Sequence, residues 1–351
     1  MENDVQSLII SGNMTIVDAM SHIDQAGKGI AFVCNDRDTL LATLSDGDIR
    51  RYIIQNGNLS NPVSMIANYN FFSLPINEKN KAEKMLQKLQ LKCIPILDAA
   101  GRLISAHFWD NTEAKKNPIP LKIPVIIQAG GKGMRLYPYT KILPKPLIPI
   151  GDLTITEHIM QRFIQNGCQD FFMIINHKKN MIKAYFSDIL HKYNMSFVEE
   201  TTPLGTGGGL KMLENTITTP FFLSNCDILI DDHYDHIYNS HKEKKNLVTM
   251  ICAAKQIIVP YGTIDINGNG EVINIKEKPA FSFMVNTGMY LFEPGIFQYI
   301  PANQFIHITD VIQIALNNGE KIGIYPISEN QWSDMGQLNE LGALRQKMGL
   351  S

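Results

Sequence analysis

Cysteine and tryptophan are scarce in this chain of 351 residues, which has five cysteines and two tryptophans. The cysteines are scattered and form no CxxC pair, which argues against zinc sites and disulfides and predicts free, buried thiols. No apolar run is long enough to cross a bilayer, and the polar, acidic segment Met1–Asp4 does not resemble a signal peptide. These absences predict a soluble, cytoplasmic protein with no membrane partner.

An excess of charge of one sign is also absent. The formal net charge is −2, so we expect no nucleic-acid partner, and any anion must be bound at a local site. No Ser-His-Asp or Cys-His constellation for nucleophilic catalysis is evident. Apolar residues make up 44% of the chain, which is enough for well-formed cores, and the length fits two domains.

A polar stretch with two prolines, at residues 111–120, separates two patterned regions. We place the first domain at residues 1–115, a linker at 116–121 and the second domain at 122–351. The first domain divides at about residue 58 into two segments with the same order of helix, strand, turn and strand, which indicates an internal duplication. The predicted elements are 15–21, 29–34 and 40–44 in the first segment, and 77–91, 93–97 and 103–107 in the second.

Two motifs of the first segment, Met14–Met20 and Leu44–Arg51, resemble the tandem cystathionine-β-synthase (CBS) module. The resemblance covers about residues 1–110. Such modules often bind adenine nucleotides in a cleft. The resemblance implies a regulatory nucleotide whose phosphate and ribose are held by Ser45 and Asp48.

The sequence departs from the CBS pattern at two places. Ala42 stands where a glycine usually permits close approach, and the second segment has Phe108–Asn111, which lacks the hydroxyl. The alternative is a module for dimerisation, in which Ser45 and Asp48 only cap a helix. Both interpretations stay open, and we expect a homo-oligomer, a dimer or larger.

Strands and helices alternate along the second domain. This alternation predicts a three-layer α/β/α fold with a mostly parallel sheet, whose ligands bind at the carboxyl ends of the strands. The predicted strands are 125–128, 171–175, 196–199, 221–223 and 247–253, and the predicted helices are 155–166 and 181–193.

A glycine-rich loop, Gly130–Gly133, follows the first of these strands. Without Cβ atoms its N–H groups can close around a phosphate, and Arg135 and Lys145 can add positive charge. The spacing is not that of a Walker A loop. A dinucleotide-binding fingerprint also fails, because Leu136 stands where its third glycine belongs.

Eight short motifs in family order resemble those of the sugar-1-phosphate nucleotidyltransferases, and they span about residues 122–340. The motifs are Ala129–Leu136 with Pro144-Lys145-Pro146, Pro203–Gly208, Asn225-Cys226-Asp227, Tyr261-Gly262, Glu277-Lys278-Pro279, Asn286-Thr287-Gly288, Thr309-Asp310 and Trp332–Gly336. The resemblance implies that a sugar 1-phosphate attacks the α-phosphorus of a nucleoside triphosphate and that pyrophosphate leaves. The nucleophile is already anionic, so no general base is needed, and charge neutralisation dominates.

The resemblance also implies a role for each matching residue. Arg135 and Lys145 are the expected catalytic cations, and Asp227 and Asp334 are expected to hold Mg²⁺. Met134 replaces a threonine that is usual in the family, which removes one hydroxyl contact. The expected nucleotide contacts are Ala129, Gly130, Gly131, Gly133, Glu200, Gly205 and Thr206, and the expected sugar-phosphate contacts are Gly262, Glu277, Lys278, Asn286 and Thr287.

The overall layout resembles bacterial guanylyltransferases of surface-glycan and legionaminic-type sugar pathways. This favours GTP and a glucosamine-, mannose- or heptose-1-phosphate, with a GDP-sugar as product. UTP, CTP or dTTP in the same reaction remain alternatives. So does a nucleotide-sensing regulatory protein with an inactive transferase domain. An NAD-dependent oxidoreductase is disfavoured by the missing third glycine.

Overall fold

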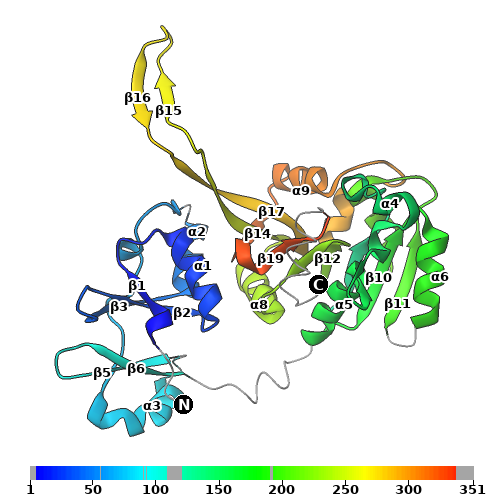
Figure 1. Ribbon diagram of the computed structural model, residues 1–351. Helices are drawn as coiled ribbons and strands as arrows, with labels where there is room; N and C mark the ends of the chain where they lie inside the picture. The colour runs from blue at the N-terminus through cyan, green and yellow to red at the C-terminus, as the bar shows by residue number, and fades with distance from the viewer. Residues whose placement is uncertain are drawn as a thin grey trace. The chain divides into compact units, whose positions relative to one another are not determined.

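The computed structural model describes residues 5–55, 57–89, 91, 93–108, 121–189 and 193–336. Its chain forms two compact units, which we treat separately (Figure 1). The first unit comprises residues 1–116, 254–285 and 328–330, and the second comprises 117–253, 286–327 and 331–351. The predicted break at 111–120 lies outside the described residues.

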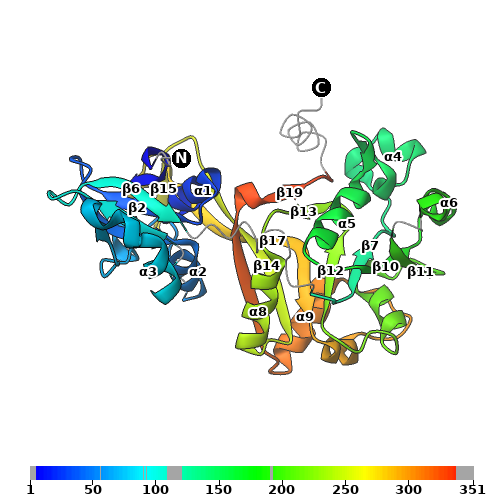
Figure 2. The same ribbon diagram turned by 90° about the horizontal axis from the view of Figure 1, so that it is seen from below.

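The second unit is built around a seven-stranded sheet. Its order is β11 (Asn194–Glu199), β10 (Asp170–Ile175), β7 (Val125–Gln128), β12 (Phe221–Asn225), β17 (Ala280–Phe292), β14 (Val248–Ile258) and β18 (Ile322–Ser328). The first four strands are parallel, and β17 is antiparallel to β12. Figure 2 shows β11, β10, β7 and β12 side by side. The predicted mostly parallel α/β sheet is confirmed, although β14 continues beyond the predicted end at residue 253.

Two helical layers cover the sheet. On one face, Val125 and Ile127 of β7 share a core with α5 (Ile155–Gln165), α6 (Lys179–Ile189) and α8 (Tyr234–Lys244). On the other face, Ile126 packs with α9 (Ile308–Asn317) and the 3₁₀ helices η7 (Gly209–Leu213) and η8 (Pro294–Tyr299). The shorter elements are η4 (Met134–Leu136), α4 (Tyr139–Ile142), η5 (Lys145–Leu147), β8 (Pro149–Ile150), β9 (Leu153–Thr154), α7 (Gly205–Gly208), β13 (Ile228–Ile230) and β19 (Trp332–Asp334).

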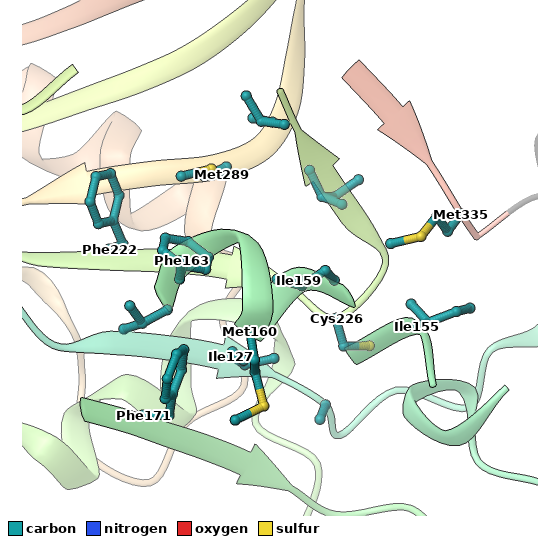
Figure 3. Packing of buried hydrophobic residues seen from close by; sticks show 14 of the residues in the cluster. Ile127, Ile155, Ile159, Met160, Phe163, Phe171, Phe222, Cys226, Met289 and Met335 are labelled. Carbon is teal, nitrogen blue, oxygen red and sulfur yellow. The ribbon is translucent and has the colours of Figure 1, made fainter. Parts of the chain in front are cut away.

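The local sequence explains why α5 forms where predicted. Thr154 is its N-cap, and the Thr154 hydroxyl accepts the N–H of Glu157 while the Glu157 carboxylate accepts the N–H of Thr154. This reciprocal pair satisfies two N–H groups that the first turn leaves free. The apolar face of α5 carries Phe163, whose ring contacts those of Phe171 and Phe222 in the core (Figure 3).

The first unit contains two small sheets with one connectivity. The strand order is β1-β2-β3 in one sheet and β4-β5-β6 in the other. In each sheet the first two strands pair in parallel fashion and the last two pair in antiparallel fashion. In each antiparallel pair the register shifts near the hairpin turn. The elements are η1 (Gln6–Leu8), β1 (Ile9–Ser11), α1 (Ile16–Ala26), β2 (Ile30–Cys34), β3 (Leu40–Ser45), α2 (Asp46–Ile54), η2 (Val63–Met65), β4 (Leu74–Pro75), η3 (Ile76–Lys81), α3 (Ala82–Leu89), β5 (Cys93–Leu97) and β6 (Leu103–Phe108). This shared connectivity fits an internal duplication.

The two halves join through their hairpin turns. The Leu40 N–H donates to the Gly101 carbonyl at 3.1 Å, and the Leu103 N–H donates to the Asp38 carbonyl at 3.0 Å. These reciprocal bonds relate the halves by a pseudo-two-fold arrangement. The unit also contains the hairpin of β15 (Thr263–Ile266) and β16 (Val272–Lys276). Of η9 (Glu329–Gln331), the first two residues belong to this unit.

Within the described ranges, none of the helices combines the length and the apolar character needed to span a membrane.

Candidate active site

The glycine-rich loop begins where β7 ends, at the carboxyl edge of the parallel strands. The Ala129 N–H donates to the Ile174 carbonyl of β10 at 2.8 Å, which keeps the start of the loop in line with the sheet. A Cβ on Gly131 would meet no heavy atom within 4 Å, so this glycine borders open space. The N–H groups of Gly131 and Lys132 form no hydrogen bond to the described part of the chain. They are available to an anion.

Gly133 turns the loop back onto Lys145. Its φ of 65° lies in the left-handed region, and a Cβ there would stand 2.9 Å from both Lys145 Cβ and Thr140 Cγ2. The Thr140 hydroxyl donates to the Gly133 carbonyl at 3.0 Å. Only glycine meets both demands, and the result is that the stem of Lys145 packs directly against the loop.

Two short strands bring distant aspartates together. β13 and β19 pair in antiparallel fashion with Ile228 opposite Asp334, so Asp227 and Asp334 become neighbours although they are far apart in sequence. Lys145 forms an ion pair with Asp227. Arg135 reaches both carboxylates, at 3.7 Å to Asp227 and 3.3 Å to Asp334. The four predicted charged residues therefore form one cluster.

Burial sets the electrostatics of this cluster. The Asp227 side chain is 4% exposed and that of Lys145 is 13% exposed. Burial raises the pKa of the Asp227 carboxyl, Lys145 lowers it, and the nearby Asp334 carboxylate raises it, with a net upward shift. A buried carboxylate in this position needs a cation close by. Lys145 supplies it.

Gly336 is a site residue that the sequence analysis did not single out. A Cβ on Gly336 would stand 2.2 Å from Asp227 Oδ2 and 2.9 Å from Lys145 Nζ, and its N–H donates to Asp334 Oδ1 at 2.9 Å. The preceding Met335 is fully buried in the core that includes Cys226 (Figure 3). The core thus anchors the chain on both sides of the carboxylate pair. The motif Trp332–Gly336 contained this signal, but only the contact distances reveal it.

Glu200 lies beside the glycine loop and is 5% exposed. A Cβ on Gly130 would stand 3.2 Å from Glu200 Oε2, and one on Gly209 would stand 2.5 Å from Glu200 Oε1. Burial raises the pKa of the Glu200 carboxyl, although a hydrogen bond from the Leu204 backbone lowers it. Among the described residues, Oε1 has no hydrogen-bond partner. A buried carboxylate oxygen left in this state is a candidate for ligand recognition.

The second glycine run, which holds Gly205 and Thr206, packs against residues 304–307. A Cβ on Gly205 would stand 2.4 Å from the Ile306 carbonyl oxygen. The Thr206 hydroxyl accepts the N–H of Ile308, and the Gln128 side chain donates to the Thr206 carbonyl, each at 3.0 Å. Close packing thus accounts for this run. Gln128, the last residue of β7, links this run to the sheet.

The predicted sugar-phosphate residues divide between the two units. In the second unit, a Cβ on Gly288 would stand 2.4 Å from the Asn225 side chain. Asn286 and Thr287 therefore lie near the end of β12, which Asp227 follows. Thr287 is 3% exposed, and its hydroxyl donates to the Ile251 carbonyl. Gly262, Glu277 and Lys278 belong to the first unit, where a Cβ on Gly262 would stand 3.1 Å from Glu277 Oε2.

Ser45 and Asp48, also in the first unit, form a capping box at the start of α2. The Ser45 hydroxyl accepts the N–H of Asp48 while the Asp48 carboxylate accepts the N–H of Ser45. Arg51 forms an ion pair with the same carboxylate. Both side chains are therefore engaged in local structure.

Fold and site together define an α/β protein with a glycine-rich loop and a buried carboxylate–cation cluster at the carboxyl edge of its sheet. The nucleotidyl transferase family model matches residues 124–349, and the chain belongs to this family.

Several curated relatives are similar to this chain over about 60% of its length. A UTP–glucose-1-phosphate uridylyltransferase from Synechocystis is 29% identical over 61% of this chain and 60% of its own length. The bifunctional protein GlmU of Methanococcus aeolicus is 29% identical over 60% of this chain and 51% of its own length. A mannose-1-phosphate guanyltransferase from Yarrowia lipolytica is 28% identical over 60% of each. The chain thus spans little more than half of these relatives.

Solved structures share the fold. HddC from Yersinia pseudotuberculosis superposes with a TM-score of 0.50 at 22% identity, covering 64% of this chain and 99% of that one. A UDP-glucose pyrophosphorylase in complex with UDP-glucose also gives 0.50, at 19% identity, covering 65% and 99%. The predicted α/β nucleotide-diphospho-sugar transferase fold is confirmed. The CBS assignment of residues 1–115 stays a prediction.

The Lys145–Asp227 pair leads to a test of stability. Lys145→Met leaves the buried Asp227 carboxylate without its cation, which should cost about 3–5 kcal/mol near pH 7. The folded-state pKa of Asp227 then rises further above its unfolded value. The loss should therefore be full at higher pH and shrink as the pH falls through that pKa. Urea unfolding at two pH values measures this.

The double variant Lys145→Met/Asp227→Asn should recover most of the lost stability, because no buried charge remains. Arg135→Met is the control, since this side chain is 62% exposed and its ion pairs should contribute less than about 1 kcal/mol. Equal destabilisation of Lys145→Met at both pH values would contradict the buried-pair explanation.

Proposed function

We propose that this protein transfers a nucleoside monophosphate, from GTP in preference to other triphosphates, to a sugar 1-phosphate. A phosphate oxygen of the sugar phosphate attacks the α-phosphorus, the bond from the α-phosphorus to the bridging oxygen breaks, and pyrophosphate leaves. The observation that carries the proposal is the single cluster of Arg135, Lys145, Asp227 and Asp334 beside the Gly130–Gly133 loop. The family membership of residues 124–349 supports the reaction class.

The reaction brings two phosphorylated anions together, so neutralisation is the main task of the site. Lys145 is nearly buried and fixed against the loop by its contact with Gly133, which suits a cation held beside the α-phosphate. Arg135 is mostly exposed and can turn toward the leaving pyrophosphate. The N–H groups of Gly131 and Lys132, which form no hydrogen bond to the described residues, would hold the triphosphate in line for attack.

The donor set fits Mg²⁺, which prefers hard oxygen ligands and takes one or two protein carboxylates. Asp227 and Asp334 are adjacent and lie against the side-chain-free Gly336. These two carboxylates would hold the ion, which would supply further neutralisation of the phosphate oxygens. Among the described residues, no group of three or more His, Cys, Asp or Glu side chains offers a second kind of metal site.

Glu200 supports the preference for GTP. The Watson–Crick edge of guanine presents two adjacent donors, N1–H and the N2 amino group, which match the two oxygens of a carboxylate. Uracil and thymine present one donor between two carbonyl oxygens, and these would repel a carboxylate. The mannose-1-phosphate guanyltransferase among the relatives is consistent with guanine, whereas the uridylyltransferase leaves the base open.

The sugar contacts remain part of the proposal. In the first unit, Glu277 would bind sugar hydroxyls, Lys278 the sugar phosphate and Gly262 the sugar. In the second unit, Asn286 and Thr287 would each contact the sugar phosphate. A glucosamine-, mannose- or heptose-1-phosphate would give a GDP-sugar for surface-glycan synthesis, of which legionaminic-type sugars are one example. A cytoplasmic homo-oligomer belongs to the same proposal.

Each of GTP, UTP, CTP and dTTP should be incubated with Mg²⁺ and a panel of sugar 1-phosphates, and pyrophosphate release measured. We expect turnover with GTP and a hexose, hexosamine or heptose 1-phosphate, and a loss of at least about 100-fold in Lys145→Met. Turnover with UTP or dTTP alone would overturn the guanylyl assignment. No turnover with any pair would favour a nucleotide-sensing protein with an inactive transferase domain.

Glu200→Gln tests base recognition. The amide offers one donor and one acceptor, so it should pair with uracil and lose one charged hydrogen bond to guanine. We expect kcat/KM for GTP to fall about 10- to 100-fold and that for UTP to rise relative to it. In the native protein, KM for GTP should increase as the pH falls through the raised pKa of Glu200, and the variant should lack this dependence. An unchanged GTP/UTP ratio would contradict the assignment.

We also propose that residues 1–115 form a CBS pair in which Asp48 acts as a helix cap rather than as a nucleotide ligand. The support is the capping box with Ser45 and the ion pair with Arg51. A ribose at this carboxylate would have to displace bonds that stabilise α2.

Asp48→Ala in the full chain separates the two roles. Loss of a cap should lower the free energy of unfolding by about 1 kcal/mol and leave the calorimetric response to AMP unchanged. Glu78→Ala, which removes only an exposed pair with Lys81, is the control. If AMP binds the native chain and Asp48→Ala abolishes that binding, the carboxylate is a ligand and the capping proposal fails.

A further inference from the structure

Lys178 makes an unusual set of contacts for a lysine outside the charged cluster. It lies between β10 and α6, and its Nζ donates to three consecutive carbonyls, those of Thr140, Lys141 and Ile142, at 2.9, 2.8 and 2.9 Å. An ammonium group has three N–H donors, so these bonds use all of them. The side chain is committed to the backbone of another segment.

The three carbonyls stand at the end of α4, where helical carbonyls lack N–H partners. Only Leu143 and Pro144 separate this segment from Lys145. Thr140 is also the residue whose hydroxyl donates to the Gly133 carbonyl and whose methyl group crowds the Cβ position of Gly133. Lys178 therefore fixes the segment from which both the loop turn and Lys145 take their positions.

The residues just before Lys178 contact the other end of the loop. The His177 N–H donates to the Gly130 carbonyl at 3.4 Å, and a Cβ on Gly130 would stand 3.3 Å from Asn176 Cβ. The turn Asn176–Lys178 thus touches the glycine loop where it begins and the α4 segment where the loop ends. The turn Asn176–Lys178 therefore contacts the start of the glycine loop directly and its end through the α4 segment.

We propose that Lys178 is a positioning residue for Lys145. It touches no reacting atom in this arrangement, and it acts by holding the α4 carbonyls so that the Lys145 ammonium stays at the attack site. The inference rests on the proposed nucleotidyl transfer. Its new content is that a lysine outside the recognised motifs sets the geometry of the main cation.

Lys178→Met should lower kcat about 10- to 100-fold, because small misplacements of a catalytic group have effects of this size. KM for the triphosphate should change by less than about threefold, since the loop N–H groups remain. Lys183→Met is the matched control. Lys183 lies on α6 and pairs with Glu199 on β11, so its loss removes a nearby lysine without touching α4. Equal losses in both variants would overturn the proposal.

Chemical rescue adds a test that a structural role alone would not satisfy. Lys178→Cys treated with 2-bromoethylamine regains an amine at nearly the lysine length, and kcat should return to within about threefold of the native value. The native thiols should not react, because all five are buried and burial raises their pKa to about 11 for Cys34 and about 12 for the others. Failure of the treated variant to recover would contradict the role of the ammonium.

A double variant tests whether Lys178 acts through Lys145. In Lys178→Met/Lys145→Met, the rate should match that of Lys145→Met alone, because the group being positioned is gone. Additive losses would mean that Lys178 acts elsewhere and would overturn the inference.

Hydrogen exchange of the ligand-free protein keeps this test separate from the proposed function. Lys178→Met should speed exchange in residues 139–147 and not in α6. Unchanged exchange in residues 139–147 would overturn the positioning role even if the enzyme is active. The native protein could show no turnover while Lys178→Met still exchanges faster in residues 139–147. That result would support the positioning role and would contradict only the proposed reaction.

Discussion

A buried carboxylate beside a second carboxylate is the constraint on which the rest of the site depends. Asp227 is almost fully covered, and Asp334 adds negative charge next to it, so a cation must stand within contact distance. Lys145 can do so only because the chain around it has no obstructing side chains. Gly133 lets its stem pack against the loop and Gly336 leaves room for its ammonium. The position of Lys145 beside Asp227 thus requires glycine at both places.

The glycines of this protein serve different physical ends, although the sequence shows them as similar runs. Gly131 borders open space, whereas Gly133 and Gly336 are required by close approach to charged side chains. Gly205 is required by the backbone of residues 304–307. Composition alone cannot separate these cases, because each depends on which distant segment passes nearby. A glycine-rich loop is therefore weak evidence for phosphate binding until its neighbours are known.

The sequence predicted the second unit well where the signal is local. The strands, the capped helix α5 and the motifs carrying Asp227 and Asp334 follow from short patterns of apolar, capping and acidic residues. Long-range packing was beyond its reach. The pairing of β13 with β19, the burial of Glu200 and the three carbonyl bonds of Lys178 depend on segments that meet only in the folded chain. No pattern around Lys178 distinguishes it from Lys179 and Lys183, which pair with Glu199 instead.

Asp227 and Glu200 are both buried acids at this sheet edge, but they differ in the partners that their carboxylate oxygens have within the protein. The protein itself supplies cations to Asp227, so that carboxylate is balanced before any ligand arrives. Glu200 has an oxygen without a hydrogen-bond partner among the described residues, and its pKa is raised by burial. An unsatisfied buried acceptor of this kind destabilises the protein, and a ligand with matching donors can offset that cost. Under the proposed function, charge neutralisation is built into Asp227, while selectivity for the base would be left to Glu200.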